Sequence, residues 1–159
     1  MKSWLRRVND DGSFTRRWAN GALRHPRSII STKALVQAML PAVHHSFVDI
    51  GAGVGTCVKF LRETGRFGYG IDGIEGVEEM SDGLVRWANL TQPLPLTFEP
   101  MLTAICIEVG EHIPADFSQV FLDNITSLAR STLVLSWAPL YRSGTGHVNC
   151  QDASWVWEQ

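Results

Sequence analysis

An aspartate followed by three glycines at alternate positions forms the sequence DIGAGVG at residues 49–55. Glycines have no Cβ, so they allow a tight turn and let backbone amides approach a ligand at the start of a helix. Asp49, just before the loop, suits a ligand with a cationic amino group better than a pyrophosphate. The dinucleotide fingerprint G-x-G-x-x-G would need glycine at the position of Thr56. The loop therefore favours a cationic ligand over a nicotinamide dinucleotide, and a tight turn without a ligand is the structural alternative.

Polar residues follow the next two apolar segments of the chain. Asp72 ends the sequence GID, where a carboxylate beside the glycine loop can accept hydrogen bonds from both hydroxyls of a ribose. Glu75 is the reserve candidate for this role. Asn89 can hydrogen-bond the amino group of an adenine while the amide of Leu90 frames the ring, and a plain turn residue is an equally good interpretation of Asn89. These positions predict a nucleoside site beside the glycine loop.

Glu108, Glu111 and His112 occur at positions i, i+3 and i+4, a spacing that brings side chains together if the turn is helical. His147 lies in a glycine-containing loop later in the chain. Two glutamates and two histidines can bind a divalent metal, which would bind substrate hydroxyls and lower their pKa. The simpler interpretation is that the cluster shapes a ligand crevice without a metal. His112 or His147 then remains a candidate general base.

The elements that carry these residues alternate between strand and helix. Predicted strands cover residues 47–50, 69–71, 84–88, 101–107 and 132–137, and predicted helices cover residues 56–63, about 75–80, and a segment that Asp116 caps. The stretch 91–100 contains three prolines and is expected to be a loop. Strands that alternate with helices predict an α/β fold with a doubly wound, mostly parallel sheet of about five strands.

The N-terminal part of the chain differs in charge from the rest. The first 33 residues hold eight lysines and arginines but two aspartates, so this part carries +6 and the remainder −8. We expect residues 1–40 to form a basic helical arm or cap, with a helix that Ser31 or Thr32 caps, and residues 41–159 to form the binding domain. The arm can steer an anionic substrate, nucleic acid included, or pair with its own acidic domain. Its possible apolar anchors are Trp4, Leu5, Val8, Phe14 and Trp18.

Composition excludes several classes of protein. A hydrophobic content of 45% and a charged content of 19% are typical of a globular domain. Apolar runs such as residues 102–107 are too short to cross a bilayer, so no membrane span is expected. No apolar stretch follows the first basic residues, so no secretory signal is expected either. The three cysteines cannot all pair and lack C-x-x-C spacing, which favours a reducing, cytoplasmic location.

Four segments of the chain together resemble the successive motifs of class I S-adenosylmethionine-dependent methyltransferases. These segments are residues 47–55, 68–72, 88–90 and 105–114, and the resemblance extends over about residues 46–151. It implies a domain that moves a methyl group from S-adenosylmethionine to an oxygen or nitrogen of an acceptor, either a small molecule or a nucleic acid. A catalytically silent subunit that uses the same fold to support a partner protein is the alternative.

The resemblance also implies roles for individual residues. The methionine end of the cofactor would lie against the glycine loop, the ribose against Asp72 and the adenine against Asn89, where the family often has aspartate. Glu108 would lie near the methyl donor, since the carboxyl ends of the strands face the ligand crevice. The expected cofactor-binding residues are Asp49, Gly51, Ala52, Gly53, Gly55, Asp72, Gly73, Asn89, Leu90 and Glu108, and the expected catalytic residues are Glu108, His112 and His147.

The glutamate and histidine cluster has a resemblance of its own. Glu108, Glu111, His112 and His147 are arranged in a way similar to the metal site of small-RNA 3′-end 2′-O-methyltransferases, and partly to that of ubiquinone-pathway O-methyltransferases. The resemblance implies a divalent metal bound by these four residues.

Methyltransferases of this class usually add two strands after the fifth, whereas 22 residues follow Trp137 here. We therefore expect the sheet to stop at five strands, or the chain to be a fragment of a longer protein. A dimer or a partner chain is expected to cover the edge of the fifth strand, because an uncovered edge promotes association. Trp155 and Trp157 are expected to start a helix that packs back on the sheet.

Overall fold

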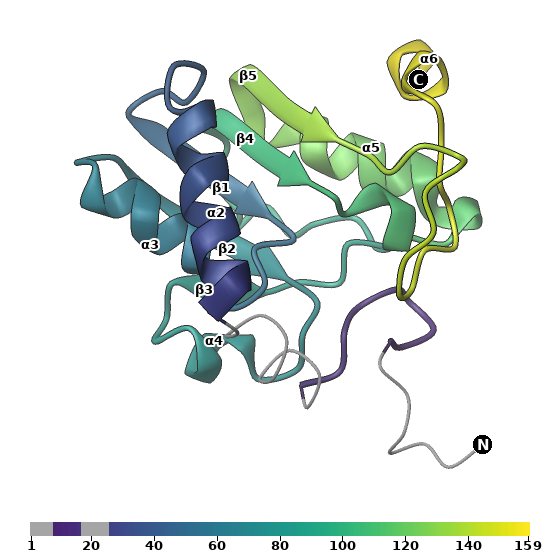
Figure 1. Ribbon diagram of the computed structural model, residues 1–159, viewed down its shortest axis with the longest axis horizontal. Coiled ribbons are helices and arrows are strands. Elements are labelled where there is room, and N and C mark those ends of the chain that lie inside the picture. The colour runs from purple at the N-terminus through teal and green to yellow at the C-terminus, as the bar shows by residue number, and fades with distance from the viewer. Residues whose placement is uncertain (1–7, 17–25) are drawn as a thin grey trace.

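A five-stranded sheet forms the centre of the molecule in the computed structural model, which describes residues 8–16 and 26–159 (Figure 1). Its strands are β1 (Ser46–Ile50), β2 (Phe67–Asp72), β3 (Val85–Trp87), β4 (Met101–Ile107) and β5 (Ala129–Ser136). The order is β3-β2-β1-β4-β5, and every neighbouring pair is parallel. The strand order reverses between β1 and β4, where the carboxyl ends of a parallel sheet open a ligand crevice. The predicted α/β fold with five parallel strands is confirmed.

Helices cover both faces of this sheet. They are α2 (Pro26–Met39), α3 (Thr56–Glu63), α4 (Val77–Met80) and α5 (Ser118–Ser127), and a further helix, α6 (Ala153–Glu158), follows at the C-terminal end. On one face, Val36 of α2 and Leu61 of α3 share a buried core with Phe47. On the other face, Phe121 of α5 shares a buried core with Val48. Neighbouring strand residues point to opposite faces, so β1 contributes to both cores and is held firmly in the middle layer.

Two helix starts differ from the sequence prediction. Helix α2 covers Pro26–Met39, so Ser31 and Thr32 lie inside it and do not cap it. Asp116 does not cap α5, because it lies inside the 3-10 turn Ala115–Phe117, and α5 begins directly after that turn.

The fifth strand also differs from its prediction. It starts at Ala129 rather than at Thr132, because Ala129 already pairs with Met101 of β4. In the described part of the chain, β5 pairs with β4 on one side and with no strand on the other. The second copy or partner chain expected at this edge stays a prediction.

The described residues of the N-terminal arm contain a short hairpin as well as α2. Val8 and Phe14 form an antiparallel bridge, and Arg16 pairs with Glu79 at 2.7 Å between Nη2 and Oε2. The proposed anchors Trp4, Leu5 and Trp18 lie outside the described residues. The division of the chain at residue 40 therefore stays a prediction.

Helix α6 contains both tryptophans expected there. The ring of Trp155 contacts that of Trp137 at 5.7 Å between centroids, whereas Trp157 is 91% exposed. One tryptophan thus packs back on the chain, and the other does not. None of the helices described here combines the length and apolarity needed to cross a bilayer.

Candidate functional site

The glycine loop connects the carboxyl end of β1 to α3. Gly51, Gly53 and Gly55 have positive φ angles of 72°, 56° and 81°, a region that residues with a Cβ rarely adopt. A Cβ on Gly51 would also overlap the side chain of Val109. The Gly51 amide donates a hydrogen bond to the Ile71 carbonyl at 2.9 Å, which ties the loop to β2. The alternating glycines therefore have a conformational cause.

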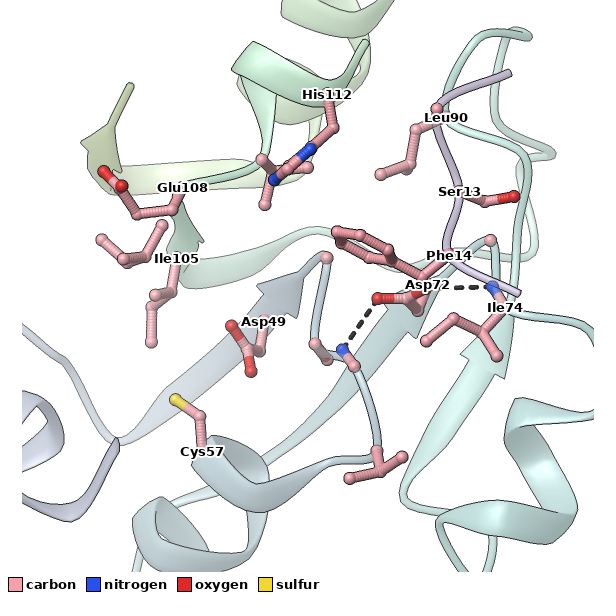
Figure 2. Close-up of a pocket in the computed structure, with 18 of the residues that line it drawn as sticks. Ser13, Phe14, Asp49, Cys57, Asp72, Ile74, Leu90, Ile105, Glu108 and His112 are labelled. Carbon is pink, nitrogen blue, oxygen red and sulfur yellow. Dashed lines mark hydrogen bonds between the residues drawn. The ribbon is translucent and has the colours of Figure 1, made fainter. Parts of the chain in front are cut away.

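A cavity of about 290 Å³ lies over this loop at the carboxyl ends of β1, β2 and β4 (Figure 2). The predicted cofactor-binding residues that line it are Asp49, Gly51, Ala52, Gly53, Asp72, Gly73, Asn89, Leu90 and Glu108. Gly55 does not line the cavity. It directly precedes α3, and a Cβ there would lie 3.1 Å from Cγ2 of Val85. Gly55 thus allows close packing between the loop and β3.

Asp49 is buried beside the glycine loop. Burial raises the pKa of its carboxyl to about 7, while a hydrogen bond with Cys57 lowers it and the negative charge of Asp72 raises it further. Figure 2 shows Cys57 beside Asp49 on the side of the cavity next to α3. A buried carboxylate without a cationic partner is costly. This position therefore favours a ligand that brings a positive charge.

Asp72 is the last residue of β2 and faces the glycine loop. Its Oδ2 accepts a hydrogen bond from the Gly53 amide at 2.7 Å, and its Oδ1 accepts one from the Ile74 amide at 3.0 Å (Figure 2). Burial raises the pKa of this carboxyl, and the backbone amides lower it. Each carboxylate oxygen can accept a further hydrogen bond, so both can still bind ribose hydroxyls. The reserve candidate Glu75 does not line the cavity.

Asn89 has the turn role that the sequence left open. Its Oδ1 accepts hydrogen bonds from the amide of Thr91 at 2.9 Å and from the Thr91 hydroxyl at 2.7 Å. Leu90 is buried, and both Asn89 and Leu90 line the cavity. Leu90 therefore offers an apolar wall at the position where the sequence placed an adenine.

Glu108 lines the cavity, and its contacts are with Ser136, the last residue of β5, and with Arg142, which follows β5. Its φ of 56° lies in the left-handed region, which is uncommon for a residue with a side chain. The Ser136 hydroxyl donates to Oε1 at 2.9 Å and accepts from the Glu108 amide at 3.0 Å. Nη1 of Arg142 lies 3.2 Å from Oε2. These contacts direct the carboxylate of Glu108 to Arg142.

The structure brings together three of the four residues of the predicted metal set. One potential ligand atom each from Glu111, His112 and His147 lies within 4.8 Å of the others, and Glu108 is not in this group. Glu111 is fully buried, and neither of its carboxylate oxygens has a hydrogen-bond partner among the described residues. Burial raises the pKa of Glu111, whereas the nearby backbone groups of Glu111 and Ala138 lower it. A buried carboxyl whose oxygens make no well-formed hydrogen bond favours a ligand that completes the site.

Hydrogen bonds orient the two histidines of this cluster. Nδ1 of His112 lies 3.1 Å from the carbonyl oxygen of Gly146, and Nδ1 of His147 lies 3.3 Å from that of Arg142. A carbonyl oxygen can only accept, so Nδ1 is the donor in each contact, and Nε2 of a neutral ring stays free to accept. Burial also lowers the pKa of His112, which favours its neutral form. Each Nε2 is thus suited to accept a proton or to bind a metal.

Several residues that line the cavity belong to no motif. They are Asp11, Gly12, Ser13 and Phe14 of the N-terminal hairpin and Thr32, Leu35 and Met39 of α2. The sequence marked Phe14 as an apolar anchor of the arm and Thr32 as a candidate helix cap, but it did not place either of them at the cavity. Ser136 and Arg142, which hold Glu108, carried no local signal.

Comparisons with known proteins point to one fold. No family model matches the chain. A magnesium-protoporphyrin O-methyltransferase from Synechocystis sp. PCC 6803 is 27% identical over 144 residues, which cover 84% of this chain and 62% of the relative's length. The structure of magnesium protoporphyrin IX methyltransferase from Synechocystis PCC 6803 with bound SAH has a TM-score of 0.62 at 22% identity, over 79% of this chain and 68% of that chain.

A second solved structure shows the same fold. The methyltransferase domain of bacterial CtHen1-C has a TM-score of 0.59 at 16% identity, over 82% of this chain and 80% of that domain. The aligned part includes most of this chain, which is built from the five-stranded sheet and the flanking helices described above. The motif resemblance is thereby confirmed, and the chain has the fold of the class I S-adenosylmethionine-dependent methyltransferases.

Proposed function

We propose that this chain is the catalytic domain of an S-adenosylmethionine-dependent methyltransferase that acts on an oxygen or nitrogen of its acceptor. The supporting observation is the placement of Asp49 and Asp72 on either side of the glycine loop in one cavity. Asp49 supplies a negative charge for the ammonium of the methionine end, and Asp72 supplies acceptors for the ribose. The relative from Synechocystis is named an O-methyltransferase, so oxygen is the first acceptor atom to test.

The proposed chemistry depends mainly on positioning. A lone pair of the acceptor forms a bond to the methyl carbon as the carbon–sulfur bond breaks, and the sulfonium becomes a neutral thioether. Holding donor and acceptor in line lowers the barrier, because the entropy of the encounter is lost on binding. His112 lines the cavity and keeps a lone pair on Nε2, so it can take the proton that leaves the acceptor.

The proposal also includes a divalent metal bound beside the cavity. The unpartnered, buried carboxyl of Glu111 beside two imidazoles fits a metal with mixed nitrogen and oxygen ligands. The ion would be held by Glu111 and by Nε2 of His112 and His147, while Glu108 stays with Ser136 and Arg142. When bound, it would lower the pKa of an acceptor hydroxyl. His112 would then act as a ligand rather than as a base.

Two measurements in sequence test the proposed function. S-adenosylhomocysteine and NAD are first titrated into the protein, and binding of the first without the second supports the cofactor assignment. Transfer of a radioactive methyl group is then measured with magnesium-protoporphyrin IX, a small RNA and simple phenols and amines as acceptors. S-adenosylhomocysteine binding without any transfer favours the catalytically silent subunit, and no S-adenosylhomocysteine binding overturns the proposal.

A further inference from the structure

The N-terminal hairpin, residues 8–16, forms one wall of the cavity although no cofactor motif includes it. Residues 11–14 line the cavity beside the ends of β2 and β4. The hairpin is internally bonded, since the Asn9 amide donates to the Ser13 carbonyl at 2.8 Å and the Ser13 amide donates to Oδ1 of Asp11 at 3.0 Å. It therefore presents a defined surface to a ligand rather than a loose strand.

Close contacts hold this hairpin on both sides of the crevice. Gly12 is buried with a φ of 86°, and a Cβ there would overlap the carbonyl group of His112, which follows β4. A Cβ on Gly73, which follows β2, would lie 2.9 Å from the Cβ of Ser13. The hairpin fits only because two glycines leave room for it. It thus spans the space between the ribose side of the site and His112.

Phe14 is the large side chain that the hairpin brings to the cavity. Its ring lies 4.9 Å from that of His112 in a T-shaped contact, and it packs against the apolar cluster that contains Ile74. Figure 2 shows Phe14 between Asp72 and His112, close to Ile74. An aromatic ring there can cover a nucleoside by stacking or edge contact and exclude water from its hydrogen bonds.

We propose that Phe14 is a cofactor-binding residue that covers the adenosine part of S-adenosylmethionine, and that the hairpin slows cofactor release by holding Phe14 in place. This inference rests on the proposed function, because it concerns the same cofactor. In this arrangement Asp72 binds the ribose, and Phe14, which lies between Asp72 and His112 in Figure 2, covers the neighbouring part of the adenosine. The glycine loop and Leu90 complete the enclosure.

The first test replaces Phe14 and follows S-adenosylhomocysteine by stopped-flow fluorescence and calorimetry. Phe14→Ala should weaken binding and speed dissociation roughly tenfold, the usual effect of losing one aromatic contact with a base. Phe14→Tyr should retain most of the affinity. The matched control is Phe67→Ala, because Phe67 is 58% exposed and its ring contacts His45 rather than the cavity.

A second ligand shows which part of the cofactor Phe14 contacts. 5′-Methylthioadenosine keeps the adenosine but lacks the amino acid, so Phe14→Ala should weaken it by the same factor as S-adenosylhomocysteine. An unchanged affinity for 5′-methylthioadenosine would contradict the assignment to adenosine. Melting curves confirm that each variant is folded.

A glycine substitution tests the hairpin itself. Gly12→Val cannot keep the contact with His112, so the hairpin should undock and S-adenosylhomocysteine should dissociate faster, as in Phe14→Ala. Gly65→Val is the control, since Gly65 has a φ of +83° but a Cβ there would meet no atom within 4 Å. If the wild type does not bind S-adenosylhomocysteine, the proposed function fails. If the wild type binds and folded Phe14→Ala has the same dissociation rate, the hairpin inference alone is overturned.

Discussion

Replacing Asp49 by asparagine tests whether this buried carboxyl binds the cationic end of the cofactor. Burial raises the pKa of Asp49 to about 7 in the ligand-free protein, so about half of these carboxyls are protonated at neutral pH. The amino group of the free amino-acid end of the ligand stays cationic in this pH range and pairs with the ionised carboxylate. Binding therefore displaces a proton, and the affinity rises as the pH increases towards 7.

The magnitude follows from the pKa of about 7. Compared with a protein in which Asp49 is fully ionised, the Kd is about 30-fold larger at pH 5.5 and about 1.3-fold larger at pH 7.5. Wild-type protein should therefore bind S-adenosylhomocysteine about 25-fold more weakly at pH 5.5 than at pH 7.5. Asp49→Asn should bind weakly at both values and lose most of this difference. Any small slope that remains reports Asp72, whose pKa burial also raises.

Isothermal titration calorimetry at the two pH values measures this dependence directly. A wild-type Kd that changes less than about threefold would refute the reasoning, because a group with a pKa near 7 must titrate in this range. A folded Asp49→Asn protein that keeps the full slope would assign the proton to another group. Melting curves at both pH values show whether each protein is folded.

The same substitution has an opposite effect on stability. The pKa of Asp49 rises from 3.8 to about 7 on folding, so the native state binds this proton more tightly than the unfolded state. The stabilising contribution is fully present below about pH 4 and is lost as the pH rises through 7. We therefore compare the free energy of unfolding of ligand-free Asp49→Asn with that of the wild type. The difference in favour of the variant should grow by about 2–3 kcal/mol from pH 5 to pH 8. Urea denaturation at both pH values checks this, and a constant difference contradicts it.

Three other substitutions test separate parts of the site. Asp72→Ala should cost about 1.5–3 kcal/mol of S-adenosylhomocysteine affinity, because a charged acceptor of ribose hydrogen bonds is lost. Calorimetry should show no change of affinity in Glu75→Ala, and a loss of affinity in Glu75→Ala alone would contradict the assignment. Gly110→Ala should lower the free energy of unfolding by about 1–3 kcal/mol in urea, because a Cβ there would overlap the Trp137 ring. His147→Ala should reproduce the loss of methyl transfer caused by a chelator and leave S-adenosylhomocysteine affinity nearly unchanged, whereas a chelator without effect would leave the cluster without a metal role.

The sequence predicts the central part of this fold because its signals are local. The apolar run of β4 requires cover on both faces, and the positive φ angles of Gly51 and Gly53 require glycine. Asp72 could be placed because its strand ends next to the glycine loop, and parallel strands bring their carboxyl ends to one edge. These residues therefore indicate the position of the cavity from the chain alone.

The remaining parts depend on contacts between distant residues. Nothing near Glu108 indicates that Ser136 and Arg142 hold it away from the histidines. The sequence marks Phe14 only as an apolar anchor of the arm, and its place beside His112 depends on Gly12, which lets the hairpin approach. Asp116 looked like a helix cap, but the chain enters α5 through a 3-10 turn that places it inside the turn. Tertiary packing, which no short motif encodes, decided the positions of Glu108 and Phe14, and the local form of the turn decided that of Asp116.

Titration of S-adenosylhomocysteine into the wild-type protein at pH 7.5 tests the central claim most directly, with NAD and the variants Asp49→Asn and Asp72→Ala measured alongside. We predict one binding site for S-adenosylhomocysteine, a higher melting temperature in its presence, no binding of NAD, and weaker binding in both variants. Folded wild-type protein that does not bind S-adenosylhomocysteine, or variants that bind it as tightly as the wild type, would contradict the assignment of this cavity to the methyl donor.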